Sequence, residues 1–177
     1  DHLGYGGEGS GSRNPDTTAV HHGADDNASG VASLIELSEK FYSVRDELQR
    51  GIIFAAFGAE EKGLIGSKYF VDNMQVDKKS IFAMINMDML GRLDTASKSL
   101  TVGGYGTASE YENIFKELEN ENDNGFYLSF NKEGYGPSDH ASFYAENIPV
   151  LFFSTGAHQD YHLPEDEERK INYIWQK

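Results

Sequence analysis

The chain of 177 residues contains no cysteine. This absence excludes disulfide bonds and thiolate metal sites, so a bound metal ion would need oxygen and imidazole ligands. No apolar run approaches the roughly 20 residues that a membrane-spanning helix requires. Basic residues are scarce as well, since 15 Lys and Arg residues stand against 29 Asp and Glu residues and the formal net charge is −14. An acidic surface repels phosphate backbones, which argues against a nucleic-acid partner.

Apolar residues suffice for one folded domain, because they make up 38% of the chain and recur in short blocks. Apolar runs and one alternating segment predict strands at residues 52–57, 81–87, 100–102, 126–130 and 150–153. Helical spacing predicts helices at residues 64–71, 109–119 and 139–144, and a longer one that begins after Ser29 and ends before Gly51. We expect this longer helix to bury one apolar face, formed by Val31, Leu34, Ile35, Leu37 and Phe41.

Strands that alternate with helices indicate an α/β layered domain with a largely parallel or mixed sheet. No internal repeat or inter-domain linker interrupts the sequence, so we expect residues 1–177 to belong to a single domain. Residues 3–24 lack apolar periodicity and predict a long loop, a type of segment that is often functional. Ligand sites in such sheets lie at the carboxyl ends of the strands, and the acidic residues of interest lie there.

Two acidic pairs lie beside predicted elements, and each pair has two interpretations. Asp25 and its neighbour Asp26 precede the first helix, within residues 23–30 (GADDNASG). They would either cap the helix or include a carboxylate that bridges metal ions. Glu60 and Glu61 follow the first predicted strand and would either begin an exposed turn or share a metal site. In the second case one Glu binds metal and the other accepts a proton from water.

Further candidate ligands follow later strands. Asp88 ends the predicted strand at residues 81–87 and precedes more apolar residues. An unpaired carboxylate in such a setting is costly, which favours a metal ligand or an ion-pair partner. His158 and His162 lie in the loop after the last predicted strand, and one histidine would complete a set of Asp, Glu and Asp ligands. Oxygen and imidazole ligands together suit zinc, or less often manganese or cobalt.

The chain resembles the clan MH zinc aminopeptidases, whose relatives include glutamate carboxypeptidases and glutaminyl cyclases. The resemblance covers nearly the whole chain. It rests on five motifs that stand in the family's order: residues 23–30 (GADDNASG), 58–67 (GAEEKGLIGS), 86–91 (NMDMLG), 138–143 (SDHASF) and 161–166 (YHLPED). It implies a three-layer αβα sandwich with a mixed, largely parallel central sheet. It also implies a two-zinc exopeptidase that hydrolyses the N-terminal peptide bond of substrates with a free N-terminus.

Within these motifs, the resemblance implies a role for each metal ligand. Asp25 matches the carboxylate that bridges the two zinc ions. Glu61 and His162 match ligands of one ion, and Asp88 matches a ligand of the other ion. All four residues are therefore expected to converge on one pocket.

The resemblance also implies catalytic and supporting residues. Glu60 matches the general base, and Tyr161 lies where some relatives use a tyrosine hydroxyl to polarise the substrate carbonyl. Asp139 matches a carboxylate behind the site. Asp1 matches the aspartate of a His-x-Asp motif, whose metal-binding histidine would lie two positions upstream. His2 directly follows the motif and is expected to be a poor substitute for that histidine.

By this resemblance, residues 1–177 form a partial catalytic domain that is incomplete at both ends. The family's opening strands and the end of its last helix would lie outside the chain, which would expose a sheet edge and favour self-association. Relatives are often exported, which gives a weak hint of an extracytoplasmic location. The alternatives are carboxypeptidase or glutaminyl cyclase chemistry on the same scaffold, and a binding domain that has lost its metals.

We predict that the 177-residue chain alone binds at most one zinc ion tightly and has little peptidase activity, whereas the intact protein would bind two ions. One ion keeps Glu61, His162 and the bridging Asp25, but the other keeps only carboxylates and lacks its imidazole. Native mass spectrometry measures the stoichiometry. Two tightly bound zinc ions, with no ligand from His2 or from another chain, would contradict the alignment of the first residues.

Overall fold

The computed structural model describes residues 3–121 and 125–173. Its centre is a four-stranded sheet in the order β1 (Met84–Met87), β4 (Val150–Ser154), β2 (Ser99–Gly103), β3 (Tyr127–Phe130). β1 is parallel to β4 and β2 is parallel to β3, whereas β2 and β4 are antiparallel. The sheet therefore consists of two parallel pairs joined by one antiparallel pair, which confirms the predicted mixed α/β class.

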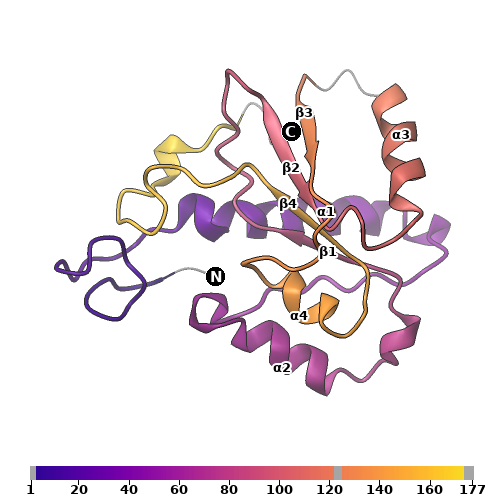
Figure 1. Ribbon diagram of the computed structural model, residues 1–177, viewed down its shortest axis with the longest axis horizontal. Coiled ribbons are helices and arrows are strands. Elements are labelled where there is room, and N and C mark those ends of the chain that lie inside the picture. Colours follow the sequence, from indigo (N-terminus) through magenta and orange to yellow (C-terminus); the bar gives the residue numbers. More distant parts are fainter. Residues whose placement is uncertain (1–2, 122–124, 174–177) are drawn as a thin grey trace.

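Helices cover both faces of the sheet (Figure 1). α2 (Ile65–Asn73) and α4 (His140–Tyr144) pack in one core cluster with Val150 of β4. α3 (Tyr111–Glu121) packs in a second cluster with Leu151, the next residue of the same strand. Successive residues of a strand point to opposite faces of a sheet. The two clusters therefore lie on opposite sides of β4, as a three-layer arrangement requires.

α1 (Gly30–Ser43) crosses behind the strands in the view of Figure 1, and its first residue lies at the carboxyl end of β1. An irregular turn, η1 (Ala24–Ser29), leads into it, and Asp26 and Asn27 within this turn have non-helical backbone angles. The Asn27 side chain joins this turn to the sheet, because its Nδ2 donates to the Met87 carbonyl at 3.0 Å and its Oδ1 accepts from the Met89 amide at 3.2 Å. The loop before α1 is thus held against the end of a strand.

The predicted helices at residues 64–71, 109–119 and 139–144 correspond to α2, α3 and α4, and four of the five predicted strands are present. The exception is residues 52–57, which belong to no strand. There the side chains of Ile52 and Ile53 are 42% and 61% exposed. An apolar run becomes a strand only where a second strand accepts its hydrogen bonds, and no described segment does so here.

The expected burial of one face of α1 is also wrong for most of that face. Val31, Ile35 and Leu37 are exposed, and Gly30 is the buried residue of the helix. Helical spacing located the face, but within the described residues no layer covers it. The chain after residue 167 forms a 3-10 turn, η5 (Glu168–Lys170), and residues 171–173 are not helical. Among the described helices none has the length and apolarity to cross a bilayer.

The close approach of α1 to β1 yields a test of the fold. A Cβ at Gly30 would overlap the Met87 carbonyl oxygen and the Asn27 side chain. Ala gains about 1 kcal/mol over Gly in a helix, but overpacking costs about 1–3 kcal/mol or more when the backbone must move. We therefore expect Gly30→Ala to lower the free energy of unfolding measured in urea. Gly51→Ala is the control, because a Cβ there meets nothing within 4 Å, and its stability should be unchanged or slightly higher.

Candidate metal centre

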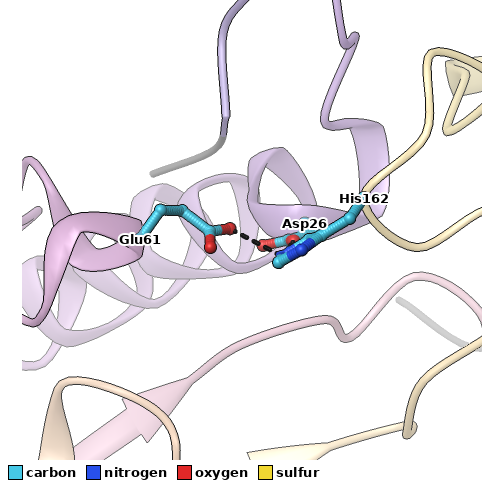
Figure 2. A group of neighbouring side chains, drawn as sticks. All are labelled: Asp26, Glu61 and His162. Atoms are coloured by element: carbon cyan, nitrogen blue, oxygen red, sulfur yellow. Dashed lines mark hydrogen bonds and ion pairs between the residues drawn. The ribbon is translucent and has the colours of Figure 1, made fainter. Parts of the chain in front are cut away.

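Three side chains from separate parts of the chain meet beside the carboxyl ends of β1 and β4 (Figure 2). Asp26 belongs to η1, Glu61 belongs to the 3-10 turn η3 (Glu60–Lys62), and His162 lies in the loop after β4. The Nε2 atom of His162 lies 3.0 Å from Glu61 Oε1 and 3.4 Å from Asp26 Oδ2. Each residue offers one ligand atom, and these atoms all lie within 4.8 Å of one another.

A main-chain contact orients the imidazole of His162. Its Nδ1 lies 3.2 Å from the carbonyl oxygen of Gly11. Because a carbonyl can only accept, Nδ1 carries the hydrogen, and in the neutral ring Nε2 then directs its lone pair at the two carboxylates. Three electron-rich atoms then converge, and only an added proton or a cation between them offsets the repulsion.

The spacing of the cluster fits zinc. Tetrahedral zinc holds nitrogen and oxygen ligands at about 2.0–2.1 Å, which places neighbouring ligand atoms about 3.3 Å apart. The observed separations from His162 Nε2 are 3.0 and 3.4 Å. Two carboxylates and one imidazole are also the ligand types that a cysteine-free zinc site uses. Asp26, Glu61 and His162 can therefore hold one zinc ion with little rearrangement.

Charge repulsion in this region perturbs several carboxyl groups. Burial, followed by the charges of Glu61, Asp88 and Glu60, raises the pKa of Asp26 to about 8. Burial, followed by the charges of Glu61, Asp88 and Asp139, raises the pKa of Glu60 to about 8. The carboxylates thus lie within electrostatic reach of one another in a partly dry environment. Such a set attracts cations.

Asp88 lies at the end of β1, and a chain of two hydrogen bonds from polar side chains holds its carboxylate in place. Ser138 Oγ donates to Asp88 Oδ2 at 2.6 Å, and Asn86 Nδ2 donates to Ser138 Oγ at 2.7 Å. Burial raises the pKa of Asp88, although the Ser138 hydrogen bond opposes that effect. The sequence analysis did not identify Ser138 as a functional residue, and its place in the SDHASF motif beside Asp139 was the available signal.

The cluster contains Asp26 where the sequence analysis expected Asp25. The Asp25 carboxylate turns the other way, and its Oδ1 accepts from the Gly91 amide at 2.6 Å and from Ser29 Oγ at 2.9 Å. Its Oδ2 lies 3.2 Å from His158 Nε2. The motif contains two adjacent aspartates that point in different directions, and their order in the sequence does not show which one faces the site.

The remaining predicted residues surround the cluster in different ways. The Tyr161 ring stacks on the His162 ring with centroids 3.7 Å apart. Burial, followed by the charges of Asp26 and Glu61, raises the pKa of the Tyr161 hydroxyl. Asp139 is buried, and burial raises its pKa. Asp1 and His2 lie outside the described residues.

The chain is similar to known proteins in both sequence and fold. The sequence profile of peptidase family M28 matches residues 1–174. Aminopeptidase YwaD of Bacillus subtilis is 29% identical over 164 residues, which cover 89% of this chain and 35% of YwaD. The crystal structure of BSAP, a zinc aminopeptidase from Bacillus subtilis, superimposes with a TM-score of 0.71 at 28% identity and covers 92% of this chain and 41% of that one. A Porphyromonas gingivalis glutaminyl cyclase shares the fold at 17% identity, with a TM-score of 0.62 and coverage of 93% of this chain and 62% of that one.

The chain therefore spans between a third and a half of the two Bacillus subtilis aminopeptidases that it matches. The matching region includes every residue of the cluster. The likeness to the glutaminyl cyclase extends to the fold alone.

The raised pKa values predict how stability depends on pH after zinc is removed with a chelator. The folded protein binds more protons than the unfolded chain between about pH 4 and pH 8, since Asp26 and Glu60 titrate near 8 only when folded. The free energy of unfolding should therefore fall as pH rises through this window. Asp26→Asn should flatten the slope and raise the melting temperature at pH 8, by about 2–4 °C for each kcal/mol of repulsion relieved. The control is Glu36→Gln on the exposed side of α1. If this variant raised the melting temperature at pH 8 as much as Asp26→Asn does, charge repulsion at Asp26 would not be the cause.

Proposed function

This chain belongs to peptidase family M28, and we propose that it forms the catalytic core of a two-zinc aminopeptidase, with residues 1–177 as part of one catalytic domain. The observation that carries the proposal is the meeting of Asp26, Glu61 and His162 at separations that suit a zinc ion. The names of similar proteins add support, since YwaD is an aminopeptidase and BSAP is a zinc aminopeptidase.

Four residues are the proposed ligands. Asp26 would take the role that the sequence analysis gave to Asp25. Glu61 and His162 would complete the set that this chain offers to one ion. Asp88 would bind the other ion, and its charge contributes to the raised pKa of Asp26, which supports their proximity. The Ser138 hydrogen bond leaves the second oxygen of Asp88 available for this purpose.

When bound, the two zinc ions supply Lewis-acid activation of water and of the scissile carbonyl. Glu60 accepts the proton of the attacking water and returns it to the leaving amine. This requires an ionised Glu60, and positive charge in the cluster favours that form against the carboxylates that raise its pKa. Tyr161 retains its proton, because burial raises its pKa. Its hydroxyl then donates a hydrogen bond to the carbonyl oxygen as negative charge develops there.

The proposed substrate is a peptide with a free N-terminus. Carboxylates gathered around the cluster attract a protonated α-amine and repel the carboxylate at the C-terminus of a peptide. The formal net charge of −14 acts in the same direction at longer range. These features support an aminopeptidase over a carboxypeptidase.

A substrate panel tests the proposal on the full-length protein. Leucine p-nitroanilide should be cleaved in a zinc-dependent manner, and N-acetyl-leucine p-nitroanilide should not, because its amine is blocked. A peptide with N-terminal glutamine should lose glutamine by hydrolysis and should not cyclise. Cleavage of the acetylated substrate, release of C-terminal residues, cyclisation of the glutamine, or zinc binding without turnover of any substrate would overturn the aminopeptidase assignment.

We predict that Glu60→Gln lowers kcat for leucine p-nitroanilide by about 10²–10⁴-fold, because a general base contributes that much. Zinc content should stay near the wild-type value, since Glu60 carries the proton and Glu61 binds the metal. Plasma mass spectrometry of the purified protein measures the zinc, and Glu36→Gln on the surface serves as the matched control. A correctly folded Glu60→Gln variant with wild-type kcat would refute the role of Glu60.

A further inference from the structure

Asp166 contacts the segment that carries Asp26 from more than 100 residues away along the chain. Its Oδ2 accepts hydrogen bonds from the main-chain amides of Asp25 and Asp26, both at 3.0 Å. Its own carbonyl oxygen accepts from the amide of Ala24 at 3.0 Å. The side chain is buried, with 3% of its surface exposed. One residue thus binds three successive amides of the turn.

These amides need an external partner because they are buried, and a buried amide without an acceptor is costly. Gly23 precedes the turn in a left-handed conformation and has no side chain to cap it. Asp166 therefore supplies the acceptors at the start of η1. The helix α1 begins later, after Ser29, where the Gly30 amide donates to Asn27 Oδ1 at 3.1 Å.

The same residue is fixed to the segment that carries His162. The amide of Asp166 donates to the carbonyl of Leu163 at 3.2 Å, which folds residues 162–166 into a compact turn. The Oδ1 atom lies 3.9 Å from His158 Nε2 and 4.0 Å from Arg92 Nη1, so the Arg92 guanidinium places positive charge beside the buried carboxylate. Asp166 therefore joins two segments, and each of them supplies one atom of the metal cluster.

We propose that Asp166 is a positioning residue that sets the separation between the Asp26 carboxylate and the His162 ring. This inference rests on the proposed zinc site. Asp166 acts through its hydrogen bonds to the main chain of residues 24–26. Loss of its side chain leaves two amides without an acceptor and frees the turn that orients Asp26.

The test compares zinc affinity in three variants of the full-length protein. Asp166→Ala should weaken the zinc Kd, measured by chelator competition, by about 10–100-fold, the usual effect of residues that support a ligand. Asp166→Asn keeps one acceptor oxygen and should recover most of the affinity. Asp160→Ala is the matched control, because Asp160 lies in the same loop and pairs with Arg92 and Lys170 without contacting residues 24–26. Its zinc Kd should change less than threefold.

A second readout separates positioning from a general loss of stability. The visible absorption of the cobalt-substituted protein reports ligand geometry, and Asp166→Ala should change it while Asp166→Asn restores it. A purely structural role would lower the melting temperature and leave the cobalt spectrum and the zinc Kd unchanged, which would overturn the proposal. If Asp166→Ala does not fold, an Asp166→Asn variant whose zinc Kd equals that of the wild type overturns the proposal, since the lost charge should still weaken zinc binding measurably.

Hydrogen exchange in the zinc-free protein distinguishes this inference from the proposed function. The amides of residues 24–26 should exchange faster in Asp166→Ala, or in Asp166→Asn if the former does not fold, while those of β4 keep their protection. If the wild-type protein binds no zinc, the proposed function is wrong, but the exchange data still test whether Asp166 holds residues 24–26 in place. Unchanged protection of the amides of residues 24–26 would overturn the proposal for Asp166.

Discussion

Repulsion among carboxylates at the carboxyl ends of β1 and β4 is the constraint on which the rest of the structure depends. Asp26, Glu60, Glu61 and Asp88 come from three separate segments, and burial makes their proximity more costly. The fold holds these groups with uncharged donors and acceptors, such as Ser138 on Asp88. In the proposed enzyme zinc converts this repulsion into attraction, so metal binding and folding stability are linked.

The parallel pair of β1 and β4 brings the segments of the cluster together. Their pairing continues past the strand ends, since the Asp88 amide donates to Phe153 and the Thr155 amide donates to Met89. Asp88, a proposed ligand, therefore follows β1 directly, and the loop with His162 starts at the neighbouring position. The turn with Asp26 joins this edge through Asn27. The register of β1 and β4 thus sets the relative positions of Asp88 and of the loop that carries His162.

The sequence predicted local structure well and long-range contacts poorly. Periodicity located α2, α3 and α4, because apolar spacing along a helix is a local property. It could not show that residues 52–57 would find no partner strand, since that depends on the rest of the chain. The family motifs placed Glu61 and His162 in the cluster region. They did not distinguish Asp26 from Asp25, because the direction of each side chain is set by contacts such as those of Gly91 and Asp166.

The glycine-rich loop of residues 3–24 meets the site through its main chain. The carbonyl of Gly11 orients His162, the carbonyl of Ser10 accepts from Lys62, and the amide of Arg13 donates to the His162 carbonyl. Apart from Gly11, which has a φ of +94°, these contacts do not depend on which side chain a position carries. Evolution can therefore exchange side chains along this loop while the imidazole of His162 keeps its orientation.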